Sequence, residues 1–112
     1  MQIAIMQPTY LPWIGYFKLM SIVDVFVLLD DTQFDKRSWQ QRNKISSKNL
    51  DFYLLTMPVI SKGLFDQKIN EVKIVNRENS IKNHINIIYH EYSKSPFFSE
   101  YFEDIKSIYN QN

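Results

Sequence analysis

Short apolar runs separated by polar residues open the chain and predict two strands. The first run, Ile3–Met6, stops before Pro8, because a proline holds the residue before it in an extended conformation and lacks a backbone donor. The second run, Val25–Leu29, is continuously apolar, which is typical of a central parallel strand covered on both faces. Between the runs, apolar residues at helical spacing predict a helix that begins at Pro12 or Trp13.

The order strand, loop, helix, strand is typical of an open parallel α/β sheet. Ligands of such sheets usually bind where the strands end at their carboxyl edge. Polar side chains follow both predicted strands directly, beginning at Gln7 and at Asp30. We therefore expect a small-molecule site at this edge of the sheet.

The rest of the chain predicts a β-hairpin, a further strand and two helices. A turn-rich spacer separates Ile45 from the apolar run Phe52–Val59, as in a hairpin. A further strand is expected over Asn70–Val75. Apolar residues three or four apart then predict a helix capped by Asn79-Ser80 and a last helix after Ser95-Pro96.

Composition limits the class of protein. The 112 residues suffice for one domain with a modest core, and a hydrophobic content of 45% is ordinary for a globular domain. Two glycines are too few for a glycine-rich phosphate loop. A net charge of +1 argues against a nucleic-acid partner, and no apolar run approaches the ~18 residues of a membrane span. The absence of cysteine is typical of a reducing compartment, so we expect a cytoplasmic protein with no membrane insertion.

The first loop and the start of the first helix carry side chains suited to hold a ring. Indole and phenol groups are apolar with one polar tip, and a helix start offers unpaired N–H groups to an anion. The alternative is that these aromatic side chains only cover the edge of the sheet. The candidate substrate-binding residues here are Gln7, Tyr10, Trp13 and Tyr16.

Two carboxylates, Asp30 and Asp31, end the second predicted strand. Successive side chains of an extended chain point to opposite sides, so only one of them can face a ligand. Asp30 is the candidate catalytic residue, as a general base, and is also where Mg²⁺ would bind if the protein uses a metal. The alternative is a turn carboxylate that bonds its own backbone. The sequence indicates no other cofactor.

Residues 35–44 look like an exposed loop or an extended arm with basic side chains around one tryptophan. Charged hydrogen bonds from such an arm suit a phosphate, and the indole suits a ring beside it. The alternatives are a solvated basic loop or nonspecific contact with RNA. The candidate substrate-binding residues in and before this arm are Gln33, Lys36, Trp39, Arg42 and Asn43.

The two histidines, His84 and His90, are six residues apart, a spacing that does not place them on one face of a helix. We expect each to be at the surface or partly buried. No Ser-His-Asp arrangement or metal-ligand spacing stands out in the chain.

Two long stretches resemble the WbqC-like family. They are Q-P-T-Y-L-P-W-I-G-Y-F, from Gln7, and D-D-T-Q-F-D-K-R-S-W-Q-Q-R-N, from Asp30, and the later Y-S-K-S-P-F-F-S-E-Y-F is also similar. Gln41 departs from the family pattern, which has Asn there. Members of the family are longer, so the resemblance implies that residues 1–112 form a single WbqC-like domain, the amino-terminal part of a longer one.

A weaker resemblance concerns the nucleotidyltransferase-like α/β fold. It implies a Rossmann-like parallel β-α-β core with an added β-hairpin and two C-terminal helices. In those enzymes a His-x-Gly-His sequence opens the first helix and binds nucleotide phosphates. Here the stretch reads Trp13-Ile14-Gly15-Tyr16. It supplies no imidazolium, so we expect adenylyl transfer to be lost.

The family resemblance also implies a function. It is that of a bacterial transferase of O-antigen or surface-polysaccharide biosynthesis, which binds a sugar nucleotide or similar phosphorylated small molecule and transfers an aminoacyl (glycyl) group. The alternative is a non-catalytic sugar-nucleotide-binding module or a truncated subunit. The apolar stripe of the last predicted helix fits packing on the chain's own sheet, self-association, or a missing C-terminal segment.

Overall fold

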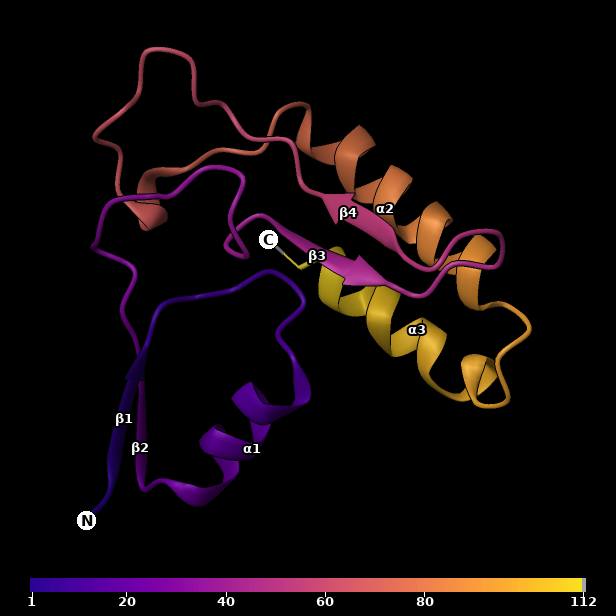
Figure 1. Cartoon of the computed structure of the whole chain (residues 1–112), viewed down its shortest axis with the longest axis horizontal. Helices are drawn as coiled ribbons and strands as arrows, with labels where there is room; N and C mark the ends of the chain where they lie inside the picture. Colours follow the sequence, from indigo (N-terminus) through magenta and orange to yellow (C-terminus); the bar gives the residue numbers. More distant parts are fainter. Residues whose placement is uncertain (112) are drawn as a thin grey trace.

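Two small sheets, three α-helices and one short 3-10 helix make up the part of the chain that the structure, a computed structural model, describes, residues 1–111 (Figure 1). This confirms the mixed α/β class, the hairpin and the two C-terminal helices expected from the sequence. In chain order the elements are β1 (Ile3–Met6), α1 (Ile14–Ile22), β2 (Val25–Leu28), β3 (Arg42–Ile45), β4 (Tyr53–Thr56), the 3-10 helix η1 (Ile69–Glu71), α2 (Arg77–Tyr92) and α3 (Phe98–Tyr109).

The first unit of the fold is β1–α1–β2, the order that the apolar pattern predicts. β1 and β2 pair in parallel, with Ile3 opposite Val25. α1 begins after Trp13, as expected. Its residue Tyr16 is buried and meets the ring of Phe26 edge to face, with the centroids 5.3 Å apart. This aromatic contact fastens the helix to one face of the sheet.

The other face of this sheet is uncovered. Side chains alternate along a strand and the register is direct, so Ile3, Ile5, Val25 and Val27 share one face. They are 54%, 59%, 42% and 38% exposed. The expectation of a strand covered on both faces is therefore wrong for this chain, because α1 covers only the opposite face. A Rossmann-like core needs further parallel strands, and residues 1–111 provide only β1 and β2 for this sheet.

The hairpin and α2 form the best-packed part of the fold. β3 and β4 pair antiparallel, and β4 lies alongside α2 (Figure 1). Apart from Tyr16, the side chains with the lowest exposure come from β4 and the residue after its end, Leu55 and Met57, and from α2, Ile81, His84 and Ile88. The hairpin is the one that the sequence predicts. Its first strand, however, takes up residues 42–44, the end of the expected exposed arm.

Two boundaries differ from the sequence-based expectation. The strand expected over Asn70–Val75 is reduced to an isolated antiparallel bridge between Ile74 and Val59. The Glu71 carboxylate accepts the N–H of Lys68 at 2.8 Å, and this tight turn forms η1 at the start of the expected strand. The cap expected at residues 79–80 is also misplaced, because α2 begins earlier. Asn76 takes a left-handed backbone conformation (φ 41°), which asparagine tolerates, and its carbonyl accepts the N–H of Ser80.

Candidate functional site

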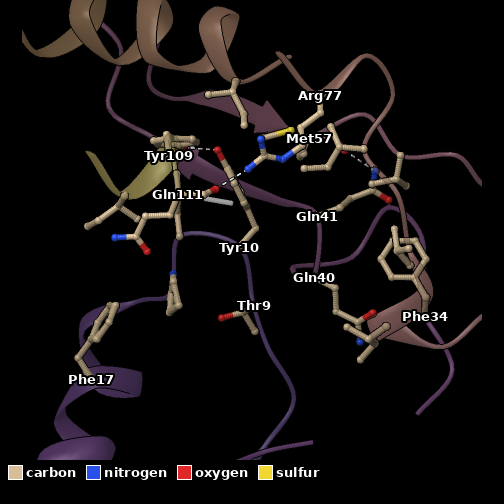
Figure 2. Close-up of a pocket in the computed structure, with 18 residues that line it drawn as sticks. Thr9, Tyr10, Phe17, Phe34, Gln40, Gln41, Met57, Arg77, Tyr109 and Gln111 are labelled. Carbon is tan, nitrogen blue, oxygen red and sulfur yellow. Dashed lines mark hydrogen bonds between the residues drawn. The ribbon is translucent and has the colours of Figure 1, made fainter. Parts of the chain in front are cut away.

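A cavity of about 730 Å³ lies where the loop after β1 meets the hairpin, α2 and α3 (Figure 2). Its volume is within the range of small-molecule sites, roughly 300–1,000 Å³. Apolar side chains from nearly every part of the fold form most of the wall, among them Phe17, Phe34, Met57, Ile81 and Ile108. Seven polar or phenolic side chains interrupt this wall: Thr9, Tyr10, Gln40, Gln41, Arg77, Tyr109 and Gln111.

Tyr10 and Tyr109 meet in the wall of the cavity and connect it to a buried histidine. The two hydroxyl groups form a short hydrogen bond, and Tyr10 Oη also lies 2.5 Å from Nδ1 of His84. The other ring nitrogen of His84, Nε2, lies 2.9 Å from the carbonyl oxygen of Thr56 in β4. One hydrogen-bonded chain therefore joins the first loop, α3, α2 and the hairpin.

The side chains of this hydrogen-bonded network, Tyr10, Tyr109 and His84, are all neutral near pH 7. Burial raises the pKa of Tyr10, and its hydrogen bond with Tyr109 raises that pKa further. Burial also raises the pKa of Tyr109, although its bond with Tyr10 partly offsets this. Burial lowers the pKa of His84, against the opposing effect of the bond with Thr56.

The loop that carries Tyr10 is held in an unusual shape by Asn43. Leu11, the next residue, has a left-handed backbone conformation (φ 46°), which a branched residue rarely adopts. The Asn43 amide donates to the carbonyls of Tyr10 and Leu11, at 3.2 and 2.7 Å. The N–H of Tyr10 donates to the carbonyl of Trp39 at 2.8 Å. Asn43 and Trp39, both predicted to bind substrate, are thus seen to support the loop that carries Tyr10.

Two of the three glutamines of the wall, Gln40 and Gln41, form hydrogen bonds at both ends of their amides with other parts of the protein. Gln41, which is buried, accepts the N–H of Arg37 at 2.7 Å and donates to the carbonyl of Met57 at 3.0 Å. Gln40 accepts the N–H of Asp35 at 2.9 Å and donates to Oε1 of Gln7 at 3.0 Å. Each of these two amides therefore has a protein partner at both its oxygen and its nitrogen.

Arg77 is the cationic side chain of the cavity wall. It stands at the first position of α2, and its guanidinium donates to the carbonyl of Gln111 at 2.5 Å. The ion pair found within residues 1–111 is Lys106–Glu103, so no carboxylate of this described part pairs with Arg77. Figure 2 shows Arg77, Tyr10 and Tyr109 at one end of the cavity and Gln40 with Phe34 at the other.

The carboxyl ends of β1 and β2 do meet at one edge, as their parallel pairing requires. The amide of Gln7 donates to Oγ1 of Thr32 at 3.0 Å and joins the two polar segments. Tyr16, by contrast, is buried under the sheet and donates its hydroxyl proton to the carbonyl of Gln7. Asp30 is exposed and lies outside the cavity wall, and its carbonyl accepts the N–H of Asn70. Its catalytic role stays a prediction.

The remaining predicted substrate-binding residues also lie outside the wall. Trp13 is 69% exposed. Gln33 donates to the carbonyl of Phe65 at 2.7 Å, and Lys36 lies 5.8 Å from the centre of the Phe65 ring. Arg42 is half-buried in β3. The structure therefore brings Tyr10 alone of the predicted set into the cavity, and groups Gln33 with Lys36 elsewhere.

The charged residue of the wall and two members of the hydrogen-bond network were not predicted from the sequence: Arg77, His84 and Tyr109. Tyr109 did carry a signal, because it belongs to the apolar stripe of the last helix, but that stripe predicts packing and not a hydroxyl contact. His84 is a lone histidine on a helix face that turns out to be buried. Nothing in the sequence position of His84 indicates that its ring forms a hydrogen bond with Tyr10, a residue distant in the chain.

Across residues 1–111 no three His, Cys, Asp or Glu side chains gather as metal ligands would. None of the described helices has the length and apolar character required to cross a bilayer.

Fold and cavity together define a small mixed α/β protein with a cavity of ligand size. The chain belongs to the WbqC-like protein family, because the model of that family matches residues 7–112. It is similar to the uncharacterized protein Rv1507c of Mycobacterium tuberculosis, with 38% identity over 109 residues. The match covers 96% of this chain and 46% of Rv1507c, so the chain spans about half the length of that relative. No solved structure matches the chain.

Proposed function

We propose that the protein binds a phosphorylated small molecule with a ring, such as a sugar nucleotide, in the cavity. The observation that carries the proposal is the make-up of the wall: mostly apolar side chains, two phenols, and one arginine without a carboxylate partner in residues 1–111. Tyr10, Phe34 and Phe17 offer faces to a ring. Arg77 offers a planar fork of donors to a phosphate, which matches its geometry.

The reaction that we propose for the complete family protein is transfer of a small acyl group, such as an aminoacyl (glycyl) group, from an activated ester or thioester donor onto such a sugar during surface-polysaccharide synthesis. The new bond to the acceptor amine or hydroxyl forms as the donor's ester bond breaks, and the donor's alcohol or thiol leaves. Asp30 follows β2 at the edge where the ends of β1 and β2 meet, the usual ligand edge of a parallel sheet. There it would act as the general base toward the acceptor amine or hydroxyl. We place this activity in the cytoplasm, the reducing compartment that the cysteine-free sequence favours.

Titration calorimetry of the chain with a panel of sugar nucleotides tests the binding proposal. Arg77→Gln removes the charged donors, so affinity should fall by about ten- to a hundredfold, the usual worth of a charged hydrogen bond. Lys94→Gln is the matched control, because it removes one exposed positive charge beyond the end of α2. Equal affinities of the two variants, or no binding by the original chain, would contradict the proposal.

A non-catalytic binding module is the second candidate function. It is favoured by the position of Asp30, which is exposed and outside the cavity wall. Mass spectrometry of the bound sugar nucleotide, after incubation with a glycyl donor, separates the two candidates. Modified sugar would show a transferase, whereas unmodified sugar that binds tightly would show the binding module.

We also propose that the β1–α1–β2 unit is one part of a Rossmann-like sheet. The occupant of its uncovered face would be the polypeptide of WbqC-like relatives that this chain does not span. Parallel sheets are normally covered on both faces, and two isolated strands are marginal in water. The exposed face and the 46% coverage of Rv1507c support this view together.

A further inference from the structure

The hydrogen bonds of the His84 network have a fixed direction. A carbonyl can only accept, so Nε2 of His84 carries a proton and donates it to Thr56 at 2.9 Å. A neutral imidazole carries one proton, and burial, which lowers the pKa of His84, keeps the ring neutral. Nδ1 of His84 is therefore an acceptor.

The protonation of His84 also fixes which atom donates in the hydrogen bonds of Tyr10 and Tyr109. Tyr10 Oη lies 2.5 Å from Nδ1 of His84, so the only hydroxyl proton of Tyr10 is donated there. Tyr109 is bonded to the same Tyr10 oxygen and must donate its own proton to it. With that proton engaged, the Tyr109 oxygen can only accept from any other group.

The other polar groups of the wall complete the account. Each end of Gln40 and of Gln41 already has a protein partner, and the amide of Gln111, an exposed residue, can donate or accept. Arg77 presents donors only. The hydroxyl of Thr9 is buried without a hydrogen-bond partner in residues 1–111, and it can donate or accept. The acceptor with a fixed orientation is therefore Tyr109, at the end of the cavity where Arg77 also lies (Figure 2).

We propose that the cavity selects ligands that present a hydrogen-bond donor, a hydroxyl or an amine, to Tyr109, and that His84 is the positioning residue that imposes this preference through Tyr10. The inference rests on the proposed function, because it concerns the same cavity. It adds that the ligand places its anionic group at Arg77 and its donor at Tyr109. An ether or carbonyl oxygen at Tyr109 would leave two acceptors facing each other without a proton.

The first test determines the protonated nitrogen of His84. In long-range proton–nitrogen correlation spectra of the ¹⁵N-labelled chain, Nε2 should be protonated and Nδ1 bare, with exposed His90 as the comparison in the same spectra. In Tyr10→Phe, which deletes the donor to Nδ1, the Nδ1 resonance should shift. A proton on Nδ1 of the original chain would overturn the inference.

The second test uses aryl phosphates as probes. The probes are 3- and 4-hydroxyphenyl phosphate and their methyl ethers, which are larger by one methyl group; the hydroxyl probes offer a donor, and the ethers offer only an acceptor. The hydroxyl probes should bind about tenfold more tightly than the ethers, the effect of one hydrogen bond set against an unpaired acceptor. Tyr109→Phe should abolish that preference while phosphate-dependent binding remains. Tyr101→Phe, an exposed tyrosine of the same helix, should keep it.

The variant Tyr10→Phe tests whether the orientation of the Tyr109 hydroxyl matters, and not only its presence. It keeps the Tyr109 hydroxyl but releases it from the histidine, so that hydroxyl can donate, and the preference for hydroxyl over ether should fall. Equal binding of both probe types by the original chain would overturn the inference and leave the proposed function standing. Failure of all four probes to bind would contradict both.

Discussion

Among single residues, the buried His84 connects α2 to the first loop and to β4. Its ring nitrogens face Tyr10 from the first loop and a carbonyl of β4, and Tyr109 of α3 lies behind Tyr10. The ring is 2% exposed. A buried neutral histidine in such a place links the stability of the fold to pH.

The free energy of unfolding should fall as the solution is acidified. Burial lowers the pKa of His84 in the folded chain, so the unfolded chain takes up a proton first. The stabilisation is complete above about pH 6.5, the ordinary histidine pKa, and is lost as the pH falls below it. The groups that face the ring, Tyr10 and Tyr109, have raised pKa values and stay neutral in this range.

Urea unfolding between about pH 8 and about pH 5 measures this dependence. His84→Gln keeps an acceptor and a donor but cannot ionise, so its unfolding free energy should vary less with pH. His90→Gln, an exposed histidine of the same helix, should behave like the original chain. A steep acid dependence that survives in His84→Gln would show that other groups cause it.

At the level of elements, an aromatic cluster joins α2 to α3. Phe98 and Phe102 stack with ring centres 4.5 Å apart, and Tyr89 of α2 lies 5.6 Å from each of them. These rings help to fix the position of α3 and, with it, the position of Tyr109. Packing here therefore also shapes the cavity.

Phe102→Ala should destabilise the fold by about 2–4 kcal/mol, somewhat less than a fully buried aromatic because the ring is half-buried. Tyr101→Ala, an exposed neighbour on the same helix, should change stability by under about 1 kcal/mol. Thermal or urea unfolding followed by circular dichroism gives both values. Similar losses in the two variants would mean that the cluster adds little to the docking of α3.

The elements themselves could largely be predicted from the sequence, because their signals are local. The proline after β1, the apolar run of β2 and the turn-rich spacer of the hairpin each act within a few residues. The error at residues 70–75 arose because the turn between Lys68 and Glu71 depends on a side-chain contact. The pattern of apolar residues does not indicate that contact.

The cavity could not be predicted to the same extent, because its walls come from distant parts of the chain. Tyr10 and Tyr109 are 99 positions apart, and Tyr10 and His84 are 74 apart. Sequence motifs indicated the first loop and the basic arm. Two of those residues, Asn43 and Trp39, hold the loop in place.

For the whole molecule, the main open surface is the apolar face of the β1–β2 sheet. Ile5→Lys should change the stability of this chain by no more than about 0.5 kcal/mol, because Ile5 is 59% exposed here. At the corresponding strand position of a family member of twice this length, the same change should cost at least about 2–3 kcal/mol, since a charge would be buried.

Urea midpoints of the short and the long protein, each with and without the lysine, provide the comparison. Leu50→Lys, in the exposed turn of the hairpin, should be harmless in both. Equally small effects of the sheet substitution in the two proteins would exclude a covering segment on this face.

The left-handed backbone of Leu11 has a consequence for the order in which the chain folds. That conformation costs about 1–2 kcal/mol for an ordinary residue. Here the side-chain amide of Asn43, a residue of β3, offsets the cost by donating a hydrogen bond to the Leu11 carbonyl. Before β3 has formed, no such amide is in position and the loop gains nothing by bending. We therefore expect the hairpin and α2 to assemble first, the loop with Tyr10 to close on them afterwards, and the binding cavity to be the last part of the molecule to be completed.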